Sequence, residues 1–450
     1  MNRTVFTQNL SFYLHVFHFY YILVTVILVI LVSDAAAQPE VTLSVRAGGS
    51  GLIGVGIEGF GPPGGSKAIA QVKSTLADDL NNSGLLQVRA LPDSLGALQA
   101  SMFQRWLGAG ASCLVLGNET RTGKAVGIKV IDLKTAITLY EDEYLIVGDR
   151  PWYTAHVIAD DIIKIYNGLR GSMTSQIAYM QSSGDYKELF IIDPDGNRNR
   201  QITFSRTLNL SPSWSADSKN IAYSTLTATN WTVVMINVNT GQTVNLTQWP
   251  GMSTSPCWSP VDPDLIAFSS TRDGNPEIYT CRKNGKELRR LTNHNAIDSS
   301  PTWSPDGSKI AFTSDRSGLP KVYVMNSDGT GVHRLTSNVD TYEDSPRWSP
   351  RGDRLAFVIM SDFGFDIATV SITGEDMVML TFGSGSNENP QWSLDGLRIV
   401  FTSTRMGGNN LFIMNWDGSN VRPLTRNGKS LSPSWAPTAS GDDIRISSRR

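Results

Sequence analysis

The chain has 450 residues, a formal net charge of −2 and 18% charged residues, below the roughly 25% of an average soluble protein. This length admits two or three domains, and a net charge near zero excludes a whole-protein field that would attract nucleic acid or acidic lipid. The three cysteines, Cys113, Cys257 and Cys281, are odd in number and cannot form a full disulfide framework. We expect buried free thiols, because no Cys-x-x-Cys or Cys/His pairing suggests a metal.

The first 37 residues differ from the rest of the chain. Residues 19–32 carry no charge and are followed by the small residues Ala35, Ala36 and Ala37. This pattern is typical of a secretory signal peptide cut near Ala37, so we assign residues 1–37 to a signal and expect the mature domains to be exported. Residues 12–18 extend the apolar stretch toward the roughly 20 residues of a membrane span, so an uncleaved anchor is the alternative.

Residues 38–170 alternate between strand-like and helix-like patterns and predict a small α/β domain. Ile69, Val72, Leu76 and Leu80 recur at helical spacing, and Pro151 suits the first position of a second long helix. We expect strands at residues 52–57, 85–89, 113–117, 126–133 and 140–147, and helices at 68–80, 103–107 and 151–166.

The first predicted strand carries a match to the dinucleotide-binding pattern Gly-x-Gly-x-x-Gly at residues 54–59. That pattern works where a strand turns into a helix whose N-terminus holds a pyrophosphate. Here the glycine- and proline-rich residues 59–65 follow, so no helix can start and we discount a nucleotide cofactor. His156 lies on the last predicted helix, where we expect a half-exposed structural residue.

The second half of the chain is an internal repeat marked by six tryptophans. Each has a proline two positions before it, and the gaps between them are 44, 45, 45, 44 and 43 residues. A period of 40–50 residues is typical of an array of identical supersecondary units. The series is Trp214, Trp258, Trp303, Trp348, Trp392 and Trp435.

One repeat contains four predicted strands, at residues 300–304, 310–313, 322–326 and 334–336. Pro305-Asp306-Gly307 and Asp328-Gly329 supply the turn chemistry between them. Four short strands in about 44 residues is the size of one β-propeller blade.

The two ends of the array are complementary fragments. The first second-strand motif, at Ile177, has no tryptophan before it, and Trp435 has no complete blade after it. We therefore expect the Trp435 segment to supply the inner strand of the first blade, because an open array would leave unpaired strand edges. The predicted fold is a small α/β N-terminal domain (residues 38–170) followed by an all-β six-bladed propeller (171–450) closed by the C-terminal strand. An open solenoid is the alternative.

The motifs give no sign of catalysis. Similar blades occur in prolyl oligopeptidase-like hydrolases, but that chemistry needs a Gly-x-Ser-x-Gly elbow with a downstream histidine, and the sequence has no such elbow. Aspartates such as Asp306 and Asp328 belong to ordinary Asp-Gly turns rather than to a cation site. The six tryptophans are expected to pack between neighbouring blades, each burying a large apolar area. We expect no enzyme activity, metal or cofactor.

The order of these parts resembles the TolB family, the periplasmic component of the Tol-Pal envelope system. The most specific matches are residues 53–55, 77–84, 108–117, 158–171 and 303–316. The resemblance implies a monomeric, non-catalytic periplasmic scaffold. It also implies two partners, the peptidoglycan-associated lipoprotein Pal on the propeller and TolA on a short N-terminal segment. The implied role is outer-membrane integrity and invagination at cell division.

The resemblance also implies where the partners bind. Val41, Leu43 and Val45 alternate along the TolA-facing segment, as suits a strand added to a partner's sheet edge, although an ordinary edge strand of its own domain is equally consistent. The Pal-facing mouth of the propeller is built by the loops that lead into the inner strands. The residues assigned to this mouth are Met252, Ser255, Asp298, Ser299, Glu343, Asp344 and Glu388.

The carboxylates among these residues predict a partner surface that carries basic groups. A different class of function remains open, namely an exported propeller that binds or hydrolyses a small peptide or glycan ligand in its central channel. The basic C-terminal tail, residues 445–450, departs from the family pattern and has no role that the resemblance supplies.

Overall fold

The computed structural model of the chain describes residues 51–61, 66–91, 101–120, 123–336, 341–437 and 444–446. The predicted export signal and the predicted TolA-facing residues Val41, Leu43 and Val45 lie outside these ranges. Within them, no helix is long and apolar enough to cross a membrane.

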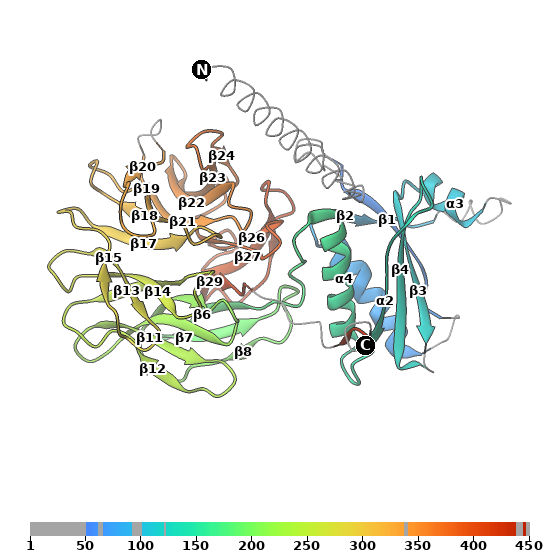
Figure 1. Cartoon of the computed structure of the whole chain (residues 1–450), viewed down its shortest axis with the longest axis horizontal. Helices are drawn as coiled ribbons and strands as arrows, with labels where there is room; N and C mark the ends of the chain where they lie inside the picture. Colours follow the sequence, from blue (N-terminus) through green and yellow to red (C-terminus); the bar gives the residue numbers. More distant parts are fainter. Residues whose placement is uncertain are drawn as a thin grey trace, which may run out of the picture. The chain divides into compact units, whose positions relative to one another are not determined.

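The N-terminal part contains a five-stranded mixed sheet with the strand order β2-β1-β3-β4-β5 (Figure 1). β1 runs parallel to both of its neighbours, whereas β3, β4 and β5 are joined by antiparallel hairpins. All five predicted strands are confirmed. They are β1 (Ile53–Gly59), β2 (Leu86–Val88), β3 (Cys113–Thr120), β4 (Ala125–Asp132) and β5 (Thr138–Leu145).

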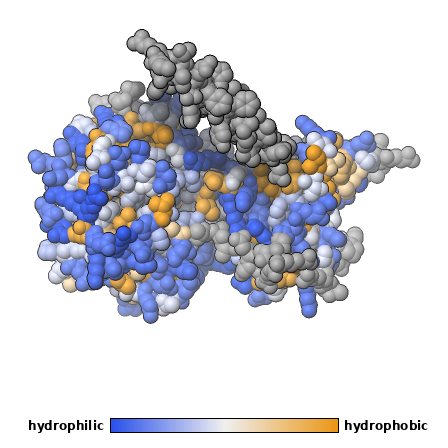
Figure 2. Space-filling view, viewed as in Figure 1, coloured by the Kyte–Doolittle hydropathy of each residue, from blue (hydrophilic) through white to orange (hydrophobic). Residues whose placement is uncertain are grey.

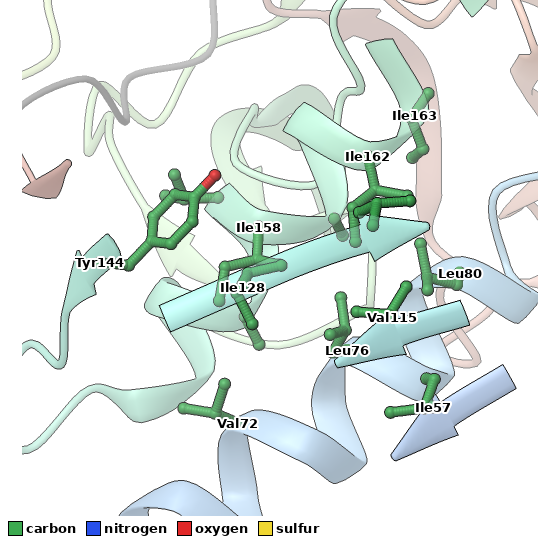
Figure 3. Close-up of a cluster of buried hydrophobic side chains, with 14 of the residues drawn as sticks. Ile57, Val72, Leu76, Leu80, Val115, Ile128, Tyr144, Ile158, Ile162 and Ile163 are labelled. Carbon is green, nitrogen blue, oxygen red and sulfur yellow. The ribbon is translucent and has the colours of Figure 1, made fainter. Parts of the chain in front are cut away.

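The two long helices, α2 (Lys67–Asn81) and α4 (Pro151–Asn167), share one hydrophobic core with this sheet. Val72, Leu76 and Leu80 of α2 are fully buried, and Ile158 and Ile162 of α4 point toward the same cluster (Figure 3). Truncating one such leucine to alanine costs about 2–5 kcal/mol of stability, so the helical spacing read from the sequence marks a genuine core face.

The short helix α3 (Met102–Gly108) packs through Trp106 on a separate small cluster. A Cβ atom on Gly56 would lie 2.6 Å from the Trp106 ring, so only glycine admits this contact. The Gly-x-Gly-x-x-Gly match lies wholly within β1, and the next described helix, α2, begins at Lys67. Its glycines therefore serve close packing.

The second half forms six four-stranded antiparallel sheets, and the six-bladed propeller is confirmed. The inner strand of the first blade is β29 (Ser430–Trp435), which pairs with β6 (Ile177–Ser183), so the C-terminal strand closes the ring as predicted. Blades 1 to 3 comprise β29, β6, β7 (Tyr186–Ile192) and β8 (Arg200–Gln201); β9 (Asn209–Trp214), β10 (Asn220–Leu226), β11 (Trp231–Asn237) and β12 (Thr243–Asn245); and β13 (Ser253–Trp258), β14 (Leu265–Ser270), β15 (Glu277–Arg282) and β16 (Arg289–Arg290).

Blades 4 to 6 repeat this arrangement from one inner strand to the next. They comprise β17 (Asp298–Trp303), β18 (Lys309–Ser314), β19 (Lys321–Asn326) and β20 (His333–Arg334); β21 (Glu343–Trp348), β22 (Arg354–Ser361), β23 (Gly364–Ser371) and β24 (Val378–Met379); and β25 (Asn387–Trp392), β26 (Arg398–Ser403), β27 (Asn410–Asn415) and β28 (Arg422–Pro423).

The repeated tryptophans pack between neighbouring blades, as predicted. Trp258 lies in a cluster that joins Ala222 and Leu246 of blade 2 to Phe268 of blade 3. Trp435 occupies the same place between blade 6 and blade 1. Each of the six boundaries between blades therefore has its own hydrophobic cluster with one of the six repeated tryptophans.

The repeated threonine at the end of each blade provides a hydrogen-bond partner for buried polar groups. In blade 3 the Thr292 hydroxyl accepts a hydrogen bond from the backbone N–H of Ile278 at 2.9 Å and donates one to Glu277 at 2.5 Å. Blades 1, 2, 5 and 6 repeat the backbone contact at the equivalent threonine. A buried N–H needs a partner, which explains the recurrence of this residue type.

The three cysteines are free, as expected: Cys113 and Cys281 are buried and Cys257 is half-buried. One feature of the C-terminus departs from the predicted boundaries, which placed residues up to 450 in the propeller. Ile444 belongs to the hydrophobic core of the N-terminal α/β part.

Candidate functional site

The mouth of the propeller is the end at which the inner strands of all six blades begin. Because the four strands of a blade are antiparallel, the connections between the second and third strands reach the same end. All seven residues that sequence analysis assigned to Pal lie in this region, at or next to the start of an inner strand.

Two of the predicted carboxylates, Asp298 and Glu343, are fully buried. Arg316 donates two hydrogen bonds to Asp298, at 3.0 and 2.8 Å. Glu343 accepts a hydrogen bond from the N–H of Val322 at 3.1 Å, and Lys321 Nζ lies 3.7 Å away. Burial raises the pKa of both carboxyls, although their hydrogen bonds and cations oppose the shift. These groups hold the inner strands in place and are not presented to a partner.

Asp344 and Glu388, one residue further along their strands, are half-buried. Asp344 accepts hydrogen bonds from Thr313 Oγ1 at 2.8 Å and from the Tyr342 hydroxyl at 3.2 Å. Glu388 accepts one from Ser386 Oγ at 2.7 Å. Of the four predicted carboxylates, these two keep partial solvent access.

Ser255 and Ser299 are both half-buried, and Ser255 belongs to a repeated backbone feature. Its φ is 52°, in the left-handed region, and its N–H donates to Ser224 Oγ of the preceding blade at 3.0 Å. Every inner strand carries a non-glycine residue with φ between 51° and 54° at this position, next to a shift in strand register. Such a β-bulge redirects the strand, so a structural role accounts for this serine. The six residues are Ser211, Ser255, Ser300, Ser345, Asn389 and Ser432.

The mouth also presents large apolar side chains, most of which sequence analysis missed. Met252 is 48% exposed, and Phe363 and Phe382 of blade 5 are 61% and 67% exposed, with ring centroids 4.9 Å apart. Hydrophobic patches interrupt the otherwise hydrophilic surface in Figure 2. We call this set the apolar mouth residues: Phe204, Met252, Ile297, Leu319, Met360, Phe363, Phe382 and Met406.

A sequence signal for the phenylalanine pair existed. Blade 4 has the polar turn Asp315-Arg316-Ser317-Gly318 between its second and third strands, whereas blade 5 has Ser361-Asp362-Phe363-Gly364. An exposed aromatic side chain at a position where the repeat has a polar residue is unfavourable in water. Such a residue indicates a contact with another molecule.

His156 is buried, so the expectation of a half-exposed residue is wrong. Its Nδ1 lies 2.6 Å from Asp79 of α2, and its Nε2 lies 3.6 Å from Asp195 in the turn between β7 and β8. The face of α4 that carries His156 packs between these two elements, which the helical pattern of α4 alone could not reveal. Burial lowers the pKa of His156, but the neighbouring carboxylates of Asp195 and Asp79 outweigh this effect and raise that pKa to about 10.

Among the residues that the structure describes, no group of three or more His, Cys, Asp or Glu side chains is arranged to hold a metal ion. The mouth offers exposed aromatic and thioether side chains together with the partly accessible carboxylates of Asp344 and Glu388.

Comparison with known protein families gives one family model, described as the TolB beta propeller domain, which matches residues 164–439. The protein TolB homolog of Chlorobium luteolum is 34% identical over 283 residues, which cover 63% of this chain and 64% of that protein. The Tol-Pal system protein TolB of Ruthia magnifica is 28% identical over 199 residues, 42% of this chain and 47% of that protein. The chain thus spans less than two thirds of the length of these curated relatives.

Solved structures extend the similarity to the N-terminal part. The crystal structure of TolB from Acinetobacter baumannii aligns with a TM-score of 0.74 and 25% identity, over 86% of this chain and 97% of the Acinetobacter chain. An alignment of that extent includes the α/β part together with the propeller, because the propeller model alone covers residues 164–439.

Proposed function

The chain belongs to the TolB β-propeller family of the Tol-Pal system, and we propose that it acts there as a non-catalytic periplasmic scaffold. In this proposal the mouth of the propeller binds the lipoprotein Pal, and the N-terminal segment around Val41, Leu43 and Val45 binds TolA. The proposed outcome is attachment of the outer membrane to the cell wall and its inward movement at division.

The observation that supports Pal binding most strongly is the set of apolar mouth residues. Exposed phenylalanine and methionine side chains are costly in water, and both residue types are enriched at protein interfaces. Phe363 and Phe382 form a preorganised pair, as expected of a hot spot at an interface centre. Asp344 and Glu388 lie at the starts of the inner strands of blades 5 and 6 and would contribute specificity for basic groups on the partner.

In this proposal each of the two parts of the chain binds a different partner. The α/β part, which we bound at residues 38–170, carries the TolA-facing segment, and the propeller carries the Pal-facing mouth. Strand addition by residues 41–45 is the proposed mode of TolA binding, since alternate side chains would occupy pockets while the main chain pairs with a sheet edge.

A titration with two matched variants tests the proposal. The soluble domain of the peptidoglycan-binding lipoprotein from the same organism is added to the protein, and its affinity is measured by calorimetry. We expect Phe363→Ser with Phe382→Ser to weaken binding at least tenfold, since hot-spot truncations cost about 2 kcal/mol or more. Ile372→Ser serves as the control, because Ile372 is 48% exposed in the connection between β23 and β24, at the opposite end of the propeller. Equal losses in both variants, or no binding by the unmodified protein, would exclude the mouth as the Pal site.

A further inference from the structure

The C-terminal segment that follows ring closure contacts the α/β part. β29 ends at Trp435, and after the stretch 438–443, which lies outside the described residues, the chain reaches Ile444, Arg445 and Ile446. Ile444 and Ile446 are 5% and 8% exposed, and Ile444 joins the core cluster of α2, α4 and the five-stranded sheet. The dark-red end of the chain lies beside α4 in Figure 1. Three residues thus contribute to a domain from which they are distant in sequence.

The backbone of this segment extends the sheet. β5 is an edge strand in the order β2-β1-β3-β4-β5. Arg445 forms an antiparallel bridge with Tyr144 of β5, and the N–H of Ile446 donates to the carbonyl of Glu143 at 2.9 Å. An extended peptide that pairs with an exposed sheet edge in this way is binding by β-strand addition.

The Arg445 side chain binds in a polar pocket formed by buried residues of the α/β part. Asp161 of α4 is 3% exposed, and its carboxylate accepts hydrogen bonds from Arg445 Nε at 2.9 Å and from Arg445 Nη2. The Tyr144 hydroxyl donates to the same carboxylate at 2.8 Å and lies 2.6 Å from the Tyr140 hydroxyl. A bidentate guanidinium–carboxylate pair is directional, so the pocket discriminates arginine from a lysine of equal charge.

The pocket belongs to the α/β part and not to the tail. Asp161 and Tyr144 are core residues. Leaving a buried carboxylate without a charged partner strongly destabilises the folded protein. Arg170 Nη2 also lies within ion-pair range of Asp161, at 3.9 Å, whereas Arg445 makes paired hydrogen bonds to it. The edge of β5 together with Asp161 therefore presents a site for an arginine carried on an extended strand.

We propose that this edge is a peptide-binding site for an extended segment with arginine between two branched aliphatic residues, and that the chain's own C-terminus occupies it as a tethered competitor. The tail has that composition, Ile444-Arg445-Ile446, and is seated in the site. A short tether gives an intramolecular ligand an effective concentration on the order of millimolar. A partner segment of the same chemistry must displace the tail, so the site is autoinhibited. This inference concerns the α/β part and does not depend on Pal binding at the mouth.

A peptide-capture experiment tests the proposal on the full chain. The probe is a fluorescent synthetic peptide of residues 441–450, and binding is followed by anisotropy. The unmodified protein should bind it at least tenfold more weakly than the Arg445→Ala variant, whose tail is released from Asp161. Adding Asp161→Asn to the Arg445→Ala variant should abolish capture. Circular dichroism of each variant verifies that the fold is kept, and Arg445→Glu provides a second released variant.

The peptide itself supplies the matched control. A probe with Arg445→Ala should lose binding, whereas one with Arg450→Ala removes the same charge and should keep most of it. Equal capture by the unmodified protein and the Arg445→Ala variant would overturn autoinhibition. Equal loss of binding with the two peptide substitutions would show only nonspecific charge attraction and contradict an arginine-specific site. Failure of both released variants to bind the unmodified peptide would exclude the site.

Discussion

The stabilising effect of the polar contacts on the closing strand can be measured by comparing one substitution at two equivalent positions of the repeat. Trp435 and Trp258 are 6% and 5% exposed and pack in equivalent clusters between blades. Trp435 Nε1 additionally donates to Ser175 Oγ at 2.6 Å, and the guanidinium of Arg398 lies 5.3 Å from its ring centroid. Trp258 Nε1 has no hydrogen-bond partner among the described residues. Replacing each tryptophan by phenylalanine therefore removes similar apolar area but different polar contacts.

The expected difference follows from the contacts that only Trp435 makes. A hydrogen bond contributes about 1 kcal/mol net, and a desolvated cation–π contact contributes about 0.5–2 kcal/mol, part of which phenylalanine keeps. Trp435→Phe should thus lower the free energy of unfolding by about 1–2 kcal/mol more than Trp258→Phe. Urea unfolding followed by circular dichroism measures both, provided the urea dependence of the two variants is equal. A cost at Trp435 no greater than at Trp258 would refute the assignment of added stability to the closing strand.

Three further predictions concern polar and charged groups. The pKa of His156 is raised from 6.5 to about 10. The stability advantage of the unmodified protein over His156→Gln should therefore be complete below pH 6.5 and be lost as the pH rises toward 10. Urea unfolding at several pH values measures this advantage. Thr292→Val should cost about 1–3 kcal/mol of stability in the same assay, because the buried N–H of Ile278 loses its acceptor; a cost near zero would contradict this. Asp344→Lys with Glu388→Lys should weaken lipoprotein binding and make it less sensitive to salt, and unchanged affinity in a titration would contradict an electrostatic role.

The blade architecture could be predicted from the sequence because each feature recurs six times. The tryptophan period, the turn residues and the terminal threonine each report the same local structure at every repeat, so errors at one blade are corrected by the others. Closure was also predictable, since an incomplete first blade and a lone last strand at Trp435 complement each other.

The burial of several charged groups could not be predicted from the sequence. Asp298 and Glu343 occupy loop-like stretches of sequence, where a carboxylate is ordinarily solvated. Their burial depends on Arg316 and Lys321, which come from the second-to-third strand connection of blade 4 and from the third strand of that blade. The burial of His156 likewise requires Asp195, from a turn of the first blade. Contacts between different elements leave no pattern within either element.

Site-specific photocrosslinking in living cells tests the central proposal, that the mouth of the propeller binds Pal. A photoreactive amino acid is placed at Phe363 on the mouth, or at Ile372 on the opposite end, and crosslinked products are identified by mass spectrometry. The proposal predicts that position 363, and not position 372, crosslinks to an outer-membrane lipoprotein with a peptidoglycan-binding domain. Crosslinking of that lipoprotein from position 372 alone, or from neither position, would contradict it.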